Sequence, residues 1–64
     1  MLRDEILEFI REYYQTKKVP PSIREILDGT NASSTSHVQY WLKELDRDGE
    51  IEYRQGQARG AIPK

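Results

Sequence analysis

Helix-breaking residues divide this chain into short segments, and this punctuation constrains the fold more than any other feature of the sequence. Pro20-Pro21 forms the first break, Asp28-Gly29 the second and Gly49 the third. Proline lacks a backbone N–H and restricts the residue before it, whereas glycine closes a helix by adopting left-handed backbone angles. Between the breaks, apolar residues recur at three- and four-residue steps. The sequence therefore predicts three helices.

The apolar residues define the inner face of each expected helix. The first helix, at about 2–16, has the stripe Leu2, Ile6, Phe9, Ile10 and Tyr13. The second, at about 23–28, follows Ser22 with Glu25 three positions later, which is a capping box. The third, at about 34–48, begins in a run of serine and threonine that offers several N-caps. Its inner face comprises Val38, Trp41, Leu42 and Leu45.

A short hairpin is expected after the third helix, at about 50–62. Ile51 and Tyr53 alternate with charged residues, which is typical of a half-buried strand. A turn with two glycines at 55–60 leads to a return strand at Ala61-Ile62. A chain of 64 residues forms one domain at most, so we expect a single domain at 1–64. The fold class is mostly α with a small β-hairpin, a three-helix winged helix-turn-helix.

Acidic residues are unevenly distributed along the chain. The formal net charge is −1 and the isoelectric point about 5.7, whereas nucleic-acid-binding domains are usually basic. Residues 29–43 contain no acid, and residues 53–64 contain three bases and no acid. These two stretches can face a polyanion while the acidic remainder faces water.

Three segments carry a more specific pattern. Residues 19–26 are V-P-P-S-I-R-E-I, residues 41–52 are W-L-K-E-L-D-R-D-G-E-I-E, and residues 58–60 are A-R-G. In this order and spacing they resemble the DNA-binding domain of the LexA repressor family, with its P-P-[ST]-x-x-E-I, L-K-x-L-x-x-x-G-x-I-E and S-R-G segments. The resemblance covers nearly the whole chain. It implies a winged helix-turn-helix that binds double-stranded DNA for a bacterial or phage transcriptional repressor.

The chain also departs from that family. LexA-like repressors carry a second, self-cleaving domain with a serine–lysine pair, which these residues do not contain. We therefore expect either a DNA-binding fragment or a stand-alone small regulator, and self-cleavage is not carried over. The resemblance implies dimeric binding, but the family's main dimer interface lies in the missing domain. Our hypothesis is a monomer that pairs as a homodimer only on a pseudo-palindromic DNA site or through a partner segment that these residues lack. Ser34–Tyr40 differ from the family's residues, which predicts a different operator.

The third helix supplies the expected base-reading residues. A recognition helix enters the major groove and needs short or bidentate polar side chains near its N-terminus. With the apolar face turned inward, the residues left outside are Ser34, Ser36, His37, Gln39 and Tyr40. Gln39 can pair with adenine, whereas one of Ser33 and Ser34 is expected to cap the helix. The competing roles are a plain exposed histidine for His37 and an ordinary surface residue for Gln39. Tyr40 can instead cover the edge of Trp41 or pack on the wing.

A second set of residues is expected to contact the DNA backbone: Ser22, Lys43, Arg47, Arg54 and Arg59. Phosphate contacts position a protein without specifying sequence. Arg59 lies in the glycine-flanked turn, where it can grip the backbone or enter the minor groove. Lys43 and Arg47 are spaced i,i+4, so solvation of the helix competes with phosphate binding. Ser22 caps the second helix, and phosphate binding there is an addition to capping.

Other classes of function lack support in the sequence. With no cysteine and one histidine, a cysteine–histidine pair is excluded, and a metal site would rely on carboxylates. We expect no enzyme, cofactor, metal site or small-molecule substrate. No apolar run approaches the ~20 residues of a membrane span, and the lack of cysteine suits a reducing compartment, which together predict a cytoplasmic protein.

Two alternatives to duplex binding remain open. Folds host many functions, and the acidic isoelectric point favours a winged helix used for protein–protein interaction. Against this alternative, the outer face of the third helix is expected to be polar, without an apolar patch. Single-stranded nucleic acid would need exposed aromatic residues on a basic groove. Tyr14, Tyr40 and Tyr53 are too scattered along the chain for that.

Overall fold

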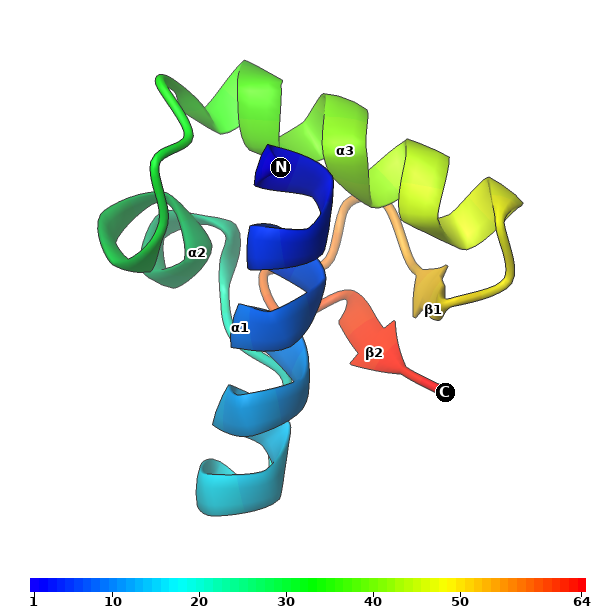
Figure 1. Cartoon of the computed structure of the whole chain (residues 1–64). Helices are drawn as coiled ribbons and strands as arrows, with labels where there is room; N and C mark the ends of the chain where they lie inside the picture. The colour runs from blue at the N-terminus through cyan, green and yellow to red at the C-terminus, as the bar shows by residue number, and fades with distance from the viewer.

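Three helices and a two-stranded hairpin make up the computed structural model, which describes residues 1–64 (Figure 1). The elements in chain order are α1 (Leu2–Lys17), α2 (Ile23–Gly29), α3 (Thr35–Arg47), β1 (Ile51–Tyr53) and β2 (Ala61–Pro63). The helix ends lie within one residue of the expected positions. The fold class predicted from the sequence, a mostly helical winged helix-turn-helix, is confirmed.

The core draws on every element. Its nine buried side chains are Ile6, Leu7, Ile10, Ile26, Val38, Leu42, Leu45, Ile51 and Ala61. Full burial of an aliphatic side chain stabilises a fold by roughly 1.5–3 kcal/mol, so this small set holds α1, α2, α3 and the hairpin together. Trp41 was expected inside. It packs only partly buried against the edge of the core, which leaves its indole N–H available to a neighbour.

A lysine ends α1. Lys18 has φ 65° and ψ 15°, and its N–H donates to the Tyr14 carbonyl oxygen at 2.8 Å. This left-handed residue closes the helix before Val19 and the proline pair are reached, so the prolines direct the connection to α2 rather than stop α1. Basic residues at this end also suit the helix dipole.

Gly29 has a different role from the one expected. It does not adopt left-handed angles, whereas Gly49 (φ 80°) and Gly56 (φ 85°) do. A Cβ on Gly29 would lie 2.2 Å from the Phe9 ring. Glycine is therefore present because α2 and α1 approach each other closely at this point, and the expectation of a left-handed helix end at Gly29 was wrong.

The hairpin is short and tightly closed. Its strands are antiparallel, with Ile51 opposite Pro63 and Tyr53 opposite Ala61. Next to the paired strands, where the turn begins and ends, the Arg54 N–H donates to the Gly60 carbonyl oxygen at 2.9 Å. A Cβ on Gly60 would lie 2.2 Å from the Arg54 carbonyl oxygen, so only glycine fits there.

Figure 1 shows α3 lying across one end of the molecule, with α2 beside it and the last turns of α1 pointing away. One side of α3 packs on the core through Val38, Leu42 and Leu45. The opposite side therefore faces outward, free of other elements.

Candidate nucleic-acid interface

Four exposed residues of α3 form one strip along its outward side. Ser36, Gln39, Tyr40 and Lys43 follow the i, i+3, i+4, i+7 spacing that places side chains on one helical face. No hydrogen bond or ion pair within the chain engages the polar groups of these four side chains. We call them the outer strip. It contains no acid, one amide and two hydroxyls, a set that suits hydrogen bonding to base edges.

Ser34 caps α3. Its hydroxyl accepts a hydrogen bond from the His37 N–H at 3.1 Å. The choice between Ser33 and Ser34 is thereby resolved, because Ser34 is the capping residue. Although Ser34 is exposed, one lone pair of its hydroxyl is already used to hold the start of the helix.

Both ring nitrogens of His37 have partners within the chain. The Trp41 indole N–H donates to Nε2 at 3.2 Å, and the Ser33 hydroxyl lies 3.0 Å from Nδ1. The Ser33 backbone N–H also donates to Nδ1, at 3.3 Å, so Ser33 meets this nitrogen through both its backbone and its side chain. His37 is half-buried and joins the turn before α3 to the middle of the helix. Contact with a base requires it to release one of these partners.

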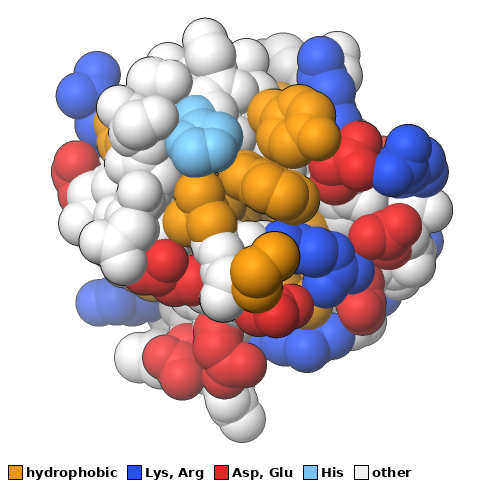
Figure 2. All heavy atoms as spheres, turned by 45° about the horizontal axis from the view of Figure 1, so that its top comes forward, with side chains coloured by type: hydrophobic (Ala, Val, Ile, Leu, Met, Phe, Trp, Pro, Cys, Tyr) orange, Lys and Arg blue, Asp and Glu red, His pale blue; other side chains and the backbone are white.

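An aromatic pair interrupts the polar outward face. Tyr40 is 55% exposed, and its ring meets the Trp41 ring edge-on, with centroids 5.0 Å apart and planes at 78°. Figure 2, which brings the α3 end of the molecule forward, shows apolar side chains gathered beside the single histidine. The contact with Trp41 that was considered as a competing role for Tyr40 is present, and base reading by Tyr40 stays a prediction. The expectation of a face without apolar surface was wrong.

Most of the cations expected at the DNA backbone already contact a carboxylate. Arg54 Nε lies 2.6 Å from Glu52, Arg59 Nη1 lies 2.8 Å from Glu25, and Arg47 pairs with Glu44 one turn earlier. Of the four cations expected at the DNA backbone, only Lys43 has no carboxylate partner. The sequence could not reveal the Arg59 pair, because its two members are 34 positions apart.

The capping box at α2 forms as expected. Ser22 Oγ accepts from the Glu25 N–H at 3.1 Å, and Glu25 Oε1 accepts from the Ser22 N–H at 2.8 Å. The Ser22 backbone N–H, together with the Arg59 guanidinium, lowers the pKa of Glu25 from 4.5 to about 2. A carboxylate therefore already occupies the Ser22 N–H, one of the backbone N–H groups at this helix start that were expected to hold a phosphate.

Two exposed residues were missed at this end of the molecule. Arg24, in the first turn of α2, and Thr35, the first residue of α3, are exposed and engage no side-chain partner. Because Ile23 and Ile26 were expected to point inward, the sequence already indicated that Arg24 lies on the outside of α2. Thr35 was considered only as a candidate cap, because the sequence does not show which of several neighbouring hydroxyl residues caps the helix.

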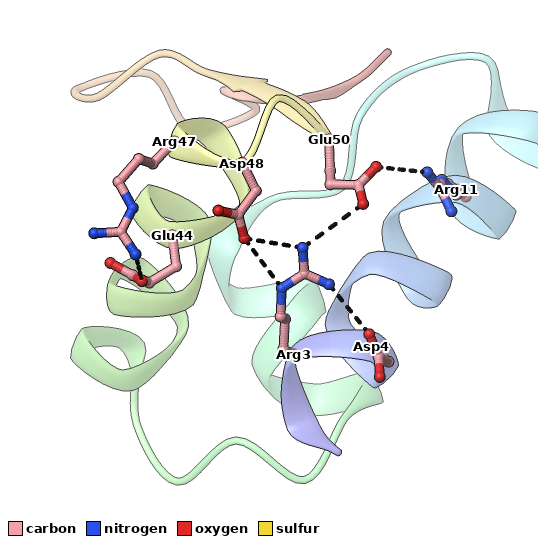
Figure 3. A network of polar contacts seen from close by, with 7 residues as sticks. All are labelled: Arg3, Asp4, Arg11, Glu44, Arg47, Asp48 and Glu50. Atoms are coloured by element: carbon pink, nitrogen blue, oxygen red, sulfur yellow. Dashed lines mark hydrogen bonds and ion pairs between the residues drawn. The ribbon is translucent and has the colours of Figure 1, made fainter.

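The acidic residues around the end of α3 are tied to arginines of α1 (Figure 3). Arg3 Nη2 lies 2.9 Å from Asp48 Oδ2 and 3.6 Å from Glu50 Oε2, and Arg11 Nη2 lies 3.2 Å from Glu50 Oε1. The Asp48 carboxylate raises the pKa of Arg3. This network neutralises the acids that follow α3, away from the start of the helix.

Neither of the two clefts on the surface lies at the expected site. The larger cleft, of about 480 Å³, is lined by Arg11, Tyr14, Gln15, Lys18, Pro63 and Lys64. None of the expected site residues lines either cleft. No group of three or more potential metal ligands occurs, and no helix combines the length and apolar character needed to cross a membrane. The expected site therefore lies outside both clefts.

Comparison with known proteins places the chain in a family. Residues 3–60 match the family described as LexA DNA binding domain. A LexA repressor of Roseiflexus sp. (strain RS-1) is 51% identical over 53 residues, which cover 73% of this chain and 24% of that protein. The LexA repressor of Corynebacterium efficiens is 52% identical over 44 residues, covering 69% of this chain and 19% of that protein. The chain thus spans about a quarter or less of the length of these curated relatives. The match over residues 3–60 shows that the chain belongs to the LexA DNA-binding domain family.

Proposed function

We propose that this domain binds double-stranded DNA in a sequence-specific manner and serves as the DNA-binding part of a transcriptional repressor. The observation that carries the proposal is the outer strip of α3, which is exposed, acid-free and without partners in the chain. The relatives named LexA repressor support it. Repression itself belongs to the whole protein, of which the relatives' matched segments are a minor part.

The outer strip suits the major groove. An α-helix with its side chains is about 10–12 Å across, and the groove is about 12 Å wide. Gln39 can donate to and accept from adenine, Ser36 can pair with several bases, and the Tyr40 ring can press on a thymine methyl group. Ser34 and His37 would lie at the same edge of the groove. Ser34 can offer its O–H and its second lone pair to a base while it caps the helix, whereas a ring nitrogen of His37 does so only after releasing a partner inside the chain.

Backbone contacts would flank the strip. Lys43 is free to meet a phosphate directly, whereas Arg47 and Arg54 do so after exchanging Glu44 and Glu52 for the phosphate oxygens. Ser22 lies at the start of α2, where its contact with a phosphate competes with Glu25. Such contacts give non-specific dissociation constants of about 10⁻⁴–10⁻⁶ M. The affinity falls as the salt concentration rises.

Specific binding calls for two copies. Dissociation constants of about 10⁻⁸ M or lower, typical of specific sites, require more contact than one such domain supplies, and two copies on a pseudo-palindromic site supply it. We propose that the domain is a monomer in solution and pairs on DNA. Analytical ultracentrifugation at micromolar concentration tests this: a stable dimer without DNA contradicts the proposal.

NMR titration of ¹⁵N-labelled protein with a random-sequence duplex at low salt tests the function. The largest amide shifts are expected at Ser36–Lys43 and Arg54–Gly60, and they should diminish as salt rises. Gln39→Ala should then weaken binding to a selected operator, whereas Gln15→Ala, a matched exposed glutamine at the far end of α1, should not. The absence of shifts at millimolar DNA overturns the proposal.

The exposed aromatic pair supports a second candidate. Tyr40, 55% exposed and edge-on to Trp41, offers the kind of amphipathic surface that is enriched in protein–protein interfaces. If DNA produces no shifts, a protein–protein interaction module becomes the better proposal. Affinity capture with wild-type and Tyr40→Ala domains then distinguishes specific partners from background.

A further inference from the structure

One arginine connects the tip of the hairpin to the helices. Arg59 Nη1 donates to Glu25 Oε1 at 2.8 Å and to the Pro20 carbonyl oxygen at 2.8 Å, and Nη2 donates to Glu25 Oε2 at 3.3 Å. The Tyr13 hydroxyl lies 3.4 Å from Nη1. A single guanidinium therefore meets α1, the α1–α2 connection and α2 at once.

The receiving carboxylate is held in place independently of Arg59. Glu25 Oε1 accepts from the Ser22 N–H at 2.8 Å, and Oε2 accepts from the Tyr13 hydroxyl at 3.0 Å. With a pKa of about 2, Glu25 stays charged throughout the neutral range. Arg59 thus docks into a prearranged acceptor with the forked geometry in which guanidinium and carboxylate match best.

The turn of the hairpin has little else to fix it. Its strands are three residues each, and residues 54–59 are all exposed. Within the hairpin, Arg54 pairs with Glu52 and bonds to Gly60. All the hydrogen bonds that this turn makes to α1, to α2 and to their connection come from Arg59. The core holds the two strands through Ile51 and Ala61, whereas the turn between them is tied to α1 and α2 by this one side chain.

We propose that Arg59 and Glu25 form a latch that fixes the turn at residues 54–59 against α2, and that Arg59 is a positioning residue rather than a phosphate contact. This inference rests on the proposed function. If Arg59 moved to a phosphate, it would lose its hydrogen bonds to Glu25 and to Pro20 and gain one new partner. If Arg59 stays in place, the turn is already ordered before DNA binds, which lowers the entropy lost on binding.

The salt dependence of DNA binding separates these two roles. The slope of log K against log salt becomes shallower by about 0.9 for each phosphate that the protein no longer neutralises. Lys43→Ala should weaken binding and reduce the slope by about 0.9. Arg59→Ala should weaken binding roughly 3- to 30-fold through the ordering of the turn, with the slope unchanged. A reduction of the slope by about 0.9 in Arg59→Ala would overturn the latch.

Glu25→Gln gives a second test in which the two roles predict opposite signs. Glutamine keeps the capping box but lacks the charge that holds Arg59. If Arg59 were a phosphate contact restrained by Glu25, this variant would bind DNA more tightly. If the two form a latch, it binds more weakly, and Arg59→Ala/Glu25→Gln is no worse than Arg59→Ala alone. Arg59→Lys should not restore affinity, because an ammonium cannot form the fork.

Measurements without DNA distinguish failure of the latch from failure of the proposed function. Amide hydrogen exchange at residues 54–59 should quicken in Arg59→Ala and Glu25→Gln, while far-UV circular dichroism stays that of the wild type. Arg54→Ala serves as the matched control, since its carboxylate partner Glu52 lies in the same hairpin. If exchange at 54–59 is unchanged in both variants, the latch is overturned even where the wild type binds DNA. If the wild type binds no duplex while exchange quickens, only the function fails.

Discussion

Glu25 shows how far single residues could be assigned from the sequence. Its capping partnership with Ser22 was predicted because the two residues are three positions apart and the pattern is local. Its contacts with Tyr13 and Arg59 were not, because they lie 12 and 34 positions away and depend on the packed fold. A different limit applies to His37, whose partners Ser33 and Trp41 are only four positions away but whose contacts depend on the side-chain rotamer in the folded helix.

Acid should destabilise the domain through Glu25. Its pKa is lowered from 4.5 to about 2 in the folded state, so its contacts stabilise the fold fully above the unfolded-state pKa. That contribution is lost as the pH falls from about 4.5 towards 2. Urea denaturation at pH 7 and at lower values should show Glu25→Gln less stable than the wild type at pH 7, with the difference shrinking as the pH falls. Glu8→Gln, on the exposed side of α1 without an ion pair, is the control. A difference independent of pH would contradict this.

At the scale of elements, the sequence predicted what local signals encode. Apolar periodicity and capping residues defined α1, α2 and α3, and alternation defined β1. Gly29 was misinterpreted because a glycine at a helix end has two explanations, a left-handed backbone or a close neighbour. The sequence contains no information on how closely Phe9 of α1 approaches α2. Shape complementarity between elements is a property of the packed molecule.

Gly29→Ala tests the close packing of α1 on α2. Alanine is favoured over glycine in a helix by about 1 kcal/mol, which predicts stabilisation from propensity alone. The new Cβ would lie 2.2 Å from the ring of Phe9, which is half-buried and packs against the core. Such overpacking costs about 1–3 kcal/mol, so we expect a lower free energy of unfolding.

A double-mutant cycle with Phe9→Leu provides the control for Gly29→Ala. Urea denaturation of the single and double variants should show that the Gly29→Ala substitution is less harmful, or stabilising, once the ring is gone. A Gly29→Ala variant that is more stable than the wild type in the presence of Phe9 would show that the ring moves aside at little cost.

At the scale of the whole molecule, the placement of charge matters more than its sum. The chain has eleven acids and ten bases, and its net charge of −1 alone suggests poor binding to DNA. Around the end of α3, however, Asp48 and Glu50 are paired with Arg3 and Arg11 (Figure 3). The outer strip carries no acid at all. The sequence predicted this acid-free stretch, but the pairing of Asp48 and Glu50 with arginines of α1 required the fold.

The pairing also predicts which acids limit DNA binding. Glu52 holds Arg54 of the hairpin at 2.6 Å, so in Glu52→Gln the arginine is released from its ion pair. We expect this variant to bind DNA more tightly than the wild type. The slope of log K against log salt should steepen by about 0.9, because one more cation meets a phosphate. Fluorescence anisotropy with one labelled duplex, from about 50 to 200 mM salt, measures both quantities.

Removal of any acid weakens general repulsion from DNA, so the matched control is Glu50→Gln. Glu50 precedes the same strand, but its partners Arg3 and Arg11 belong to α1 and are not among the residues expected at the DNA. Both variants change the net charge equally, so a general effect of charge would tighten binding to the same extent in each and leave the two slopes equal. A larger increase in affinity and a steeper slope in Glu52→Gln alone means that Arg54 contacts a phosphate once it is free. If affinity and slope change equally in the two variants, Arg54 does not contact DNA. Lys43 is then the principal cation that contacts phosphate beside α3.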